Sequence, residues 1–236
     1  MIDDTRPPSN LARAREVLEL IPRAYRGLGH LGPRGPVDGP KCLVVPGFIA
    51  TDRTSMELRR AFAAGGWHTF GWGMGLNRGA RADTVHRLGE RLEEVAGNGQ
   101  VLLVGWSLGG VFARELAREH ASRVTAVVTL GSPFSGDPRW NNVWKLYERV
   151  AGHAVDAPPI ARVEAKPPVP SLALWSRRDG IVAPRAAFGL EGERDEAVEV
   201  GCTHMGFAVD RAGTRLVVTQ TRQFLERRGL AVPGSR

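Results

Sequence analysis

Apolar residues recur along this chain in two alternating patterns: short continuous runs, and longer stretches in which apolar positions lie three or four residues apart. Short runs are typical of strands buried on both faces, whereas the longer spacing is typical of helices with one buried side. The runs predict strands at 42–45, 67–70, 101–104, 124–130, 172–175 and about 197–200. The spaced stretches predict helices at 9–27, 54–64, 83–95, 109–119, 138–150 and 212–228.

Strands that alternate with helices predict an α/β fold in three layers, with a mostly parallel central sheet of about six strands between two layers of helices. The alternation is interrupted at 131–170, which holds seven of the sixteen prolines. We therefore interpret residues 1–236 as a single domain, with an N-terminal helix and linker at 1–40 and an insertion at 131–170. In the N-terminal helix the expected cap is Ser9 or Asn10. Its expected apolar side consists of Leu11, Val17, Leu18 and Ile21.

The composition is that of an ordinary globular protein, because 42% of the residues are hydrophobic and 24% are charged. No apolar run reaches the roughly 18 residues that a membrane-spanning helix needs. The first residues, Met1 to Asp4, are acidic and are not followed by the apolar stretch of a secretory signal. These features predict a cytoplasmic protein without a transmembrane segment.

The net charge is +7, and arginine supplies almost all of the positive charge. The arginines are spread along the chain, and many lie beside acidic residues. A nucleic-acid-binding protein more often gathers them in a patch with aromatic residues. We therefore expect a solvated basic surface and no specific nucleic-acid partner.

The two cysteines, Cys42 and Cys202, are too few for a disulfide framework or a zinc cluster. One falls in an early strand and the other in a loop after the last strand, so we expect them to lie far apart and unpaired. The chain contains no His-Glu-x-x-His metal motif, and neither a P-loop nor a Gly-x-Gly-x-x-Gly turn opens a βα unit. We therefore expect neither a metal nor a cofactor.

The first candidate for catalytic chemistry is Gly105-Trp106-Ser107-Leu108-Gly109, a Gly-x-Ser-x-Gly pentapeptide. It follows a buried strand and leads directly into a helix, which is the setting of a nucleophile elbow. The flanking glycines permit a sharp turn that holds the serine in a strained conformation with its oxygen exposed. The alternative is a glycine-rich turn with an incidental serine, but the setting favours Ser107 as a nucleophile.

A nucleophilic serine needs a base, and the base needs an acid that orients it. Of the six histidines only His204 lies beyond the last strand, and it is the expected base. The expected acid is Asp179, which follows the strand at 172–175, although an Asp-Gly pair is also common in turns. Asp195, in a charged run, and Asp210, at a helix start, are less well placed. A nucleophilic pair of Cys202 with His204 would lack an elbow.

An oxyanion hole needs two backbone N–H groups, one from the residue after the nucleophile and one from a loop after an earlier strand. Leu108 supplies the first. The second is expected in Val45-Pro46-Gly47-Phe48-Ile49, where Phe48 is the best candidate. The alternative for this segment is an ordinary Pro-Gly turn that ends a strand.

Together these segments resemble the small bacterial serine hydrolases of the α/β-hydrolase superfamily, on its lipase and esterase side. The matching segments span about 41–228 and are Pro46–Phe48, Gly105–Gly110, Leu130–Phe134, Ser176–Val182 and His204. Gly71–Asn77 also resembles a glycine-rich loop of a bacterial group within this superfamily. The resemblance implies the three-layer α/β-hydrolase fold, with the Ser107 strand near the centre of the sheet and a cap at 131–170. Pro46 and Trp106 stand where many lipases place a histidine, which reshapes the substrate pocket.

The resemblance and the Ser-Asp-His order predict an enzyme that cleaves small-molecule carboxylic esters through an acyl-enzyme intermediate. A thioesterase or acyltransferase with the same triad, and a non-catalytic small-molecule binder, are the alternatives. One face of the expected helix at 138–150 carries an apolar stripe, formed by Trp140, Val143, Trp144, Tyr147 and Val150. This stripe either packs on the sheet as core or walls a pocket that favours hydrophobic acyl groups. The expected pocket residues are Trp106, Phe134, Trp144 and Met205, together with Phe48.

Overall fold

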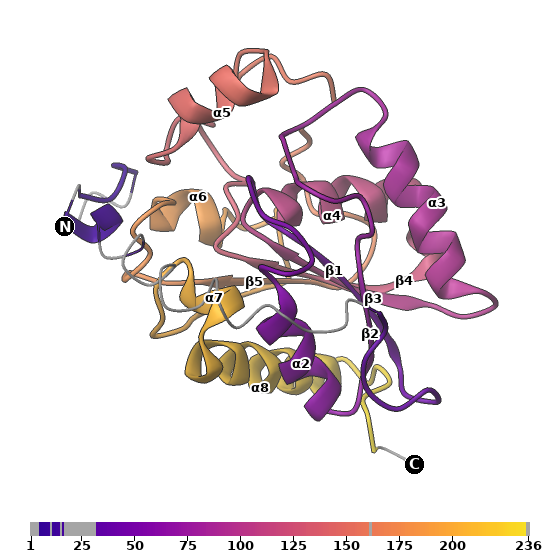
Figure 1. Cartoon of the computed structure of the whole chain (residues 1–236). Coiled ribbons are helices and arrows are strands. Elements are labelled where there is room, and N and C mark those ends of the chain that lie inside the picture. Colours follow the sequence, from indigo (N-terminus) through magenta and orange to yellow (C-terminus); the bar gives the residue numbers. More distant parts are fainter. Residues whose placement is uncertain (1–4, 10, 15, 17–31, 161, 235–236) are drawn as a thin grey trace.

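A parallel β-sheet forms the centre of the structure, a computed structural model that describes residues 5–9, 11–14, 16, 32–160 and 162–234 (Figure 1). Within these residues the sheet has six strands in the order β2-β1-β3-β4-β5-β6, and every neighbouring pair is parallel. The strands are β1 (Lys41–Val45), β2 (His68–Gly71), β3 (Val101–Trp106), β4 (Val124–Leu130), β5 (Ser171–Trp175) and β6 (Glu196–Glu199). The order places β3, which leads to Ser107, inside the sheet, and each strand begins and ends within two residues of its predicted position.

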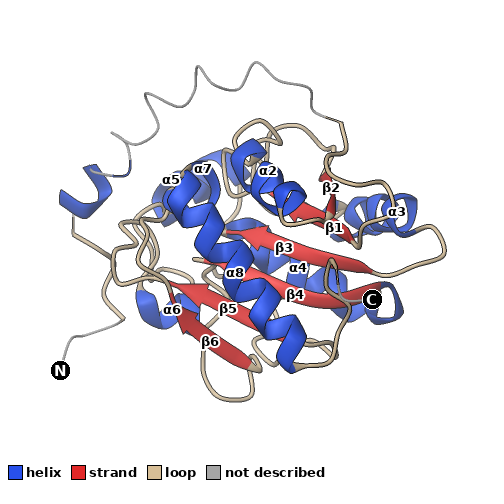
Figure 2. Ribbon diagram, turned by 90° about the horizontal axis from the view of Figure 1, so that it is seen from below, coloured by secondary structure: helices blue, strands red, loops and turns tan. Residues whose placement is uncertain are grey.

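Helices cover both faces of the sheet, which gives three layers (Figures 1 and 2). Their bounds are α2 (Met56–Ala64), α3 (Thr84–Ala96), α4 (Leu108–Glu119), α5 (Trp144–Ala151), α6 (Pro184–Phe188), α7 (Gly206–Val209) and α8 (Arg211–Arg227), with the short 3-10 helix η2 (Ala121–Arg123) before β4. Alternate strand residues point to opposite faces. Cys42 and Val44 therefore pack towards α2 and α8, whereas Leu43 and Val45 pack towards α3 and α4.

The sequence did not predict the start of α5, which begins at Trp144 rather than near 138. The side chain of Asn141 explains the delay, because its Nδ2 donates to the carbonyl of Pro138 at 2.7 Å and its Oδ1 accepts from the N–H of Val143 at 3.0 Å. Such bonds offer the backbone a local alternative to helical ones. Trp140 consequently precedes the helix and packs near Val182.

The N-terminal segment agrees with the expected helix only in part. Ser9 caps it, since its hydroxyl accepts a hydrogen bond from the N–H of Ala12 at 3.3 Å. Leu11 is 83% exposed, so it does not contribute to a buried side. The expected apolar residues Val17, Leu18 and Ile21, and the alternative cap Asn10, lie outside the described residues.

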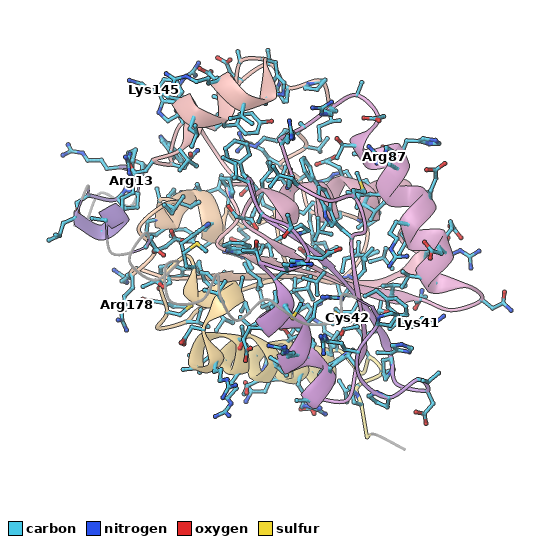
Figure 3. The ribbon with its side chains drawn as sticks, in the orientation of Figure 1. Arg13, Lys41, Cys42, Arg87, Lys145 and Arg178 are labelled. Carbon is cyan, nitrogen blue, oxygen red and sulfur yellow. The ribbon has the colours of Figure 1, made fainter. Side chains whose placement is uncertain are left out.

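Basic side chains lie both in the interior, where Arg59 and Arg114 are buried, and on the surface. Figure 3 shows Arg13, Arg87, Lys145 and Arg178 at separate positions on the periphery, on the N-terminal segment, α3, α5 and the loop after β5. The described helices include none that is both long and apolar enough to cross a membrane. Cys42 lies in β1 and Cys202 in the loop after β6, and both thiols are buried and free.

The N-terminal end of α4 packs against β1 so closely that only glycine fits at position 109. A methyl group added to Gly109 would overlap the carbonyl oxygen of Val45 and meet that of Pro46 at 2.7 Å. Since both obstacles are backbone atoms, a larger residue must separate the helix from the strand.

We therefore expect Gly109→Ala to lower the free energy of unfolding by more than about 2 kcal/mol, measured by urea denaturation. The matched control is Gly99→Ala, where the nearest atom to the new methyl group lies 3.6 Å away. The control should change the free energy of unfolding by less than about 1 kcal/mol. Equal stability of the two variants would contradict the assigned packing.

Candidate active site

Ser107 occupies the sharp turn between β3 and α4. Its backbone has φ 54° and ψ −125°, and Ile49 is the one other non-glycine residue with positive φ in the described chain. Such a conformation is strained and persists only where the surrounding structure enforces it. The enforcement includes a hydrogen bond from the N–H of Ser107 to the carbonyl of Leu130, at 2.8 Å.

Asp179 and His204 form a buried hydrogen-bonded pair at the same edge of the sheet. Asp179 follows β5 and His204 follows β6, and 2.8 Å separates the Asp179 Oδ2 from the His204 Nδ1. Asp179 Oδ1 accepts from the N–H groups of Ile181 and Val182, each at 2.8 Å. The carboxylate is thereby fixed, and its second oxygen holds the Nδ1 proton, which leaves Nε2 as the acceptor nitrogen.

The surroundings of His204 raise its pKa. Burial alone would lower the pKa, but the charge and hydrogen bond of Asp179, with the charge of Glu16, outweigh it. A raised pKa means that the imidazole takes up a proton more readily than an exposed histidine does. This property suits a base that must hold a proton transiently.

The two other aspartates considered from the sequence have structural partners elsewhere. Asp195 accepts from Lys166 Nζ at 2.9 Å and from the N–H of Ser171 at 2.8 Å, and so fixes the start of β5. Asp210 caps α8 by accepting from the N–H groups of Ala212 and Gly213. These bonds place Asp195 at the start of β5 and Asp210 at the start of α8.

Trp106 links the serine turn to the histidine loop. Its indole N–H donates to the carbonyl of His204 at 3.1 Å, and the two rings lie 5.7 Å apart. At the end of β4, a methyl group added to Gly131 would lie 2.7 Å from Asp179 Oδ2 and 3.1 Å from His204 Nδ1. The ends of β3, β4, β5 and β6 therefore bring Ser107, Asp179 and His204 to one region.

The loop after β1 lies against the serine turn. A methyl group on Gly47 would meet Ser107 Cβ at 3.0 Å. The N–H groups of Phe48 and Leu108 donate to no residue within the described part of the chain. Unpaired backbone N–H groups beside a candidate nucleophile are what an oxyanion hole requires.

Asn77 holds the loop after β1 in place, a contact that the sequence analysis missed. Its side-chain Nδ2 donates to the carbonyl of Pro46 at 2.9 Å, and its main-chain carbonyl accepts from the N–H of Ile49 at 2.8 Å. Asp52 fixes the start of the glycine-rich loop by accepting from the N–H groups of Trp72 and Gly73. The glycine-rich stretch at 71–79 marks an unusual loop in the sequence, but it does not show that this loop contacts the loop after β1.

A mostly apolar cavity of about 80 Å³ opens beside Ser107. Its lining comes from the loop after β1, from α4 and from the segment 131–170, and Arg162 is the one charged side chain in it. Its residues are Phe48, Ala80, Ser107, Leu108, Val111, Phe112, Pro133, Pro138, Asn141, Val143, Trp144, Tyr147, Val155, Pro158, Ile160, Arg162 and Val182.

Of the four residues expected to line the pocket in addition to Phe48, only Trp144 does so. Trp106 and Met205 belong to the core on the α2 and α8 side of the sheet. Phe134 is 1% exposed and packs beneath the guanidinium of Arg114, 4.3 Å from its ring centre. The apolar stripe on 140–150 divides similarly, since Val143, Trp144 and Tyr147 line the cavity while Val150 is 38% exposed.

Tyr147 of α5 connects the segment 131–170 to the rest of the site. Its hydroxyl accepts from the N–H of Ala80 at 3.1 Å, and its ring lies 5.3 Å from that of Phe48. His153 contributes to the same tie, because its Nε2 lies 3.1 Å from the carbonyl of Ala80. This network holds α5 over the loop that carries Phe48.

Cys202 does not form a reactive pair with His204. Burial, with the nearby negative charges of Asp179, Glu16 and Asp210, raises the pKa of its thiol to about 12. A neutral thiol is a poor nucleophile. The described residues also contain no group of three or more His, Cys, Asp or Glu side chains arranged to hold a metal ion.

Comparison with known proteins identifies the fold. A family model described as the alpha/beta hydrolase fold matches residues 80–159. Two curated relatives, the pimeloyl-[acyl-carrier protein] methyl ester esterases of Vibrio vulnificus strains YJ016 and CMCP6, are 34% identical over 73 residues. That match covers 30% of this chain and spans only 28% of the length of each relative.

Solved structures match over most of the chain. A carboxylesterase from Bacillus subtilis superposes with a TM-score of 0.58 at 15% identity, covering 89% of this chain and 98% of that one. A putative lipase from Acinetobacter baumannii AYE gives 0.58 at 16% identity, covering 92% and 96%. Such low identities establish the shared fold rather than a shared substrate. The chain has the alpha/beta hydrolase fold, which these solved structures of a carboxylesterase and a putative lipase share.

Proposed function

We propose that this protein is a carboxylic-ester hydrolase that uses Ser107 as nucleophile, His204 as base and Asp179 as the acid that orients it. The observation that carries the proposal is the 2.8 Å hydrogen bond between buried Asp179 and His204, which leaves Nε2 as the acceptor nitrogen. The strained backbone of Ser107 supports it as well. A protein that only binds small molecules has no need of such strain at a serine.

The reaction follows from these roles. Ser107 Oγ attacks the ester carbonyl while His204 Nε2 takes its proton, and the N–H groups of Phe48 and Leu108 stabilise the developing oxyanion. The tetrahedral intermediate collapses, the alcohol leaves with the proton from His204, and the acyl group stays on Ser107. A water molecule then attacks the acyl-enzyme with His204 again as base, which releases the acid and restores the serine.

The substrate class follows from the cavity beside Ser107. Its walls are mostly apolar, with Arg162 as the one charged side chain, so most of the cavity favours a hydrophobic acyl group. The named relatives point in the same direction, since they include esterases of a pimeloyl methyl ester and a carboxylesterase. A thioesterase or acyltransferase would use the same residues and differ in leaving group or acceptor. We favour ester hydrolysis because the relatives are named as esterases.

Replacing the nucleophile tests the reaction itself. We expect wild-type protein to react with a fluorophosphonate probe and to hydrolyse p-nitrophenyl esters faster than thioesters of the same acyl group. Ser107→Ala should abolish labelling and leave only the small residual rate that binding and the oxyanion hole supply. Ser122→Ala, an exposed serine in η2, is the matched control and should label fully. Normal ester turnover by Ser107→Ala would contradict the proposal.

Replacing the acid distinguishes Asp179 from its neighbours. Asp179→Asn keeps the size of the side chain but favours the wrong imidazole tautomer, so we expect kcat to fall by about three to four orders of magnitude. Asp195→Asn is the matched control, and it should lower the Tm without changing kcat, because Asp195 pairs with Lys166. A large kcat loss in Asp195→Asn with wild-type kcat in Asp179→Asn would reverse the assignment.

Shortening a cavity wall tests the acyl preference. Each buried methylene of the acyl group contributes about 0.8 kcal/mol, so Trp144→Ala should reduce kcat/KM for hexanoate esters about tenfold more than for acetate esters. Leu146→Ala, an exposed position on the same helix that does not line the cavity, should leave the ratio unchanged. Equal losses on both esters with a lowered Tm would assign Trp144 to the core.

A further inference from the structure

Glu16, from the N-terminal segment, lies buried between the loops that carry Asp179 and His204, with 2% of its surface exposed. Its Oε1 accepts from the N–H groups of Gly180 at 2.9 Å and of His204 at 2.8 Å. Its Oε2 accepts from the N–H of Met205 at 2.8 Å. One carboxylate thus binds the residue after the acid, the base itself and the residue after the base.

The N-terminal segment makes further contacts with the loop after Asp179. A methyl group on Gly180 would lie 2.5 Å from the carbonyl oxygen of Ala12 and 2.9 Å from Glu16 Cγ, so glycine permits the close approach. Asn142 Nδ2 donates to the carbonyl of Pro8 at 2.6 Å and to that of Gly180 at 3.0 Å. The N-terminal segment therefore packs along the turn after Asp179, with Pro8, Ala12 and Glu16 facing it.

Glu16 is also one of the two charged groups that act on His204. Asp179 is the other, and both carboxylates favour the protonated imidazole. Within the described part of the chain, Trp106 of β3 and Gly131 after β4 also lie close to the imidazole, and both are uncharged. Glu16 does not line the cavity beside Ser107.

We propose that Glu16 is a positioning residue, whose carboxylate joins the two loops through three main-chain N–H groups and so fixes His204 relative to Asp179. The inference rests on the proposed function, because it assigns Glu16 a part in the same reaction. Glu16 acts through His204 and not on the substrate. Its loss should therefore reduce kcat and leave KM unchanged.

Glu16→Gln is the principal test, measured as kcat, KM and the pH dependence of kcat/KM on one ester. The amide has one acceptor oxygen, which can keep the bonds from Gly180 and His204, but its NH2 group then faces the N–H of Met205 and that bond is lost. Because this displaces the loop that carries His204, we expect kcat to fall about tenfold to a hundredfold. The unprotonated imidazole is the active form, and removing a negative charge lowers its pKa. The acid limb of the profile should therefore move to lower pH.

A control variant and the pH profile distinguish a positioning role of Glu16 from a loss of stability. Asp195→Asn removes another carboxylate that accepts a backbone N–H, and it should leave the acid limb at the wild-type pH. A loss of stability alone would lower the active fraction at every pH without moving the limb. A folded Glu16→Gln protein with wild-type kcat and an unmoved acid limb would overturn the proposal.

Glu16→Asp is the second variant, and it decides the matter if Glu16→Gln does not fold. It keeps the charge near His204 but shortens the side chain by one methylene. We expect the acid limb to stay in place while kcat falls several-fold, short of the loss in Glu16→Gln. Wild-type kcat in Glu16→Asp would overturn the proposal, since the reach of the carboxylate would then have no effect.

Wild-type protein and Ser107→Ala, assayed beside these variants, separate a failure of the proposed function from a failure of the role proposed for Glu16. If wild-type protein neither hydrolyses esters nor labels at Ser107, the proposed function fails. If wild-type protein is active and Ser107→Ala is not, the proposed function stands. The results for Glu16→Gln and Glu16→Asp then bear on Glu16 alone.

Discussion

The close approach of α4 to β1 and β3 is the constraint on which the rest of the site depends. At positions 105, 109 and 110 an added methyl group would overlap the backbone of Gly110, the backbone of Val45 and the hydroxyl of Ser132, respectively. With glycine at all three, the helix begins directly at the sheet, and the chain must turn within one residue. That turn gives Ser107 its positive φ and places the N–H of Leu108 beside the loop that carries Phe48. The strained backbone of Ser107, the proposed nucleophile, is thus a consequence of the packing of α4 against the sheet.

Carboxylates at this edge of the sheet accept hydrogen bonds from main-chain N–H groups. Asp179 accepts two such bonds, Glu16 accepts three and Asp52 accepts two. Hydrogen bonds to charged groups contribute about 1.5–3 kcal/mol each, enough to fix a loop without a salt bridge. The choice of partner matters at His204, because an arginine placed there would lower the pKa of the imidazole that the carboxylates raise.

The strands and most helices were predictable because continuous apolar runs and helical spacing report burial directly. The pair of Asp179 and His204 was predictable from chain order, since the carboxyl ends of parallel strands meet at one edge of a sheet. The pocket was not, because burial cannot distinguish a core residue from a wall of a cavity: Phe134, Trp106 and Met205 pack inward while Trp144 faces the cavity. Asn77 and Glu16 were missed for a different reason. Their partners are backbone groups distant in sequence, which no local pattern marks.

The segment 131–170 is tied to the rest of the structure from several sides, and these ties shape the cavity beside Ser107. Tyr147 bonds to the N–H of Ala80 above the Phe48 loop. In the part of the segment that leads to β5, the carbonyls of Glu164 and Ala165 accept from Arg114 of α4 at 2.7 and 3.1 Å. Arg118, one turn further along α4, donates to the carbonyl of Val163 at 2.7 Å.

The helix that begins at Ser107 therefore also holds the far wall of the cavity. Because buried guanidinium groups lose these bonds only at high cost, the wall cannot move away from α4 freely. The proposed acyl preference would then depend on the same helix that follows Ser107. A substitution that widens the cavity must act on side chains such as Trp144 rather than on the path of the backbone.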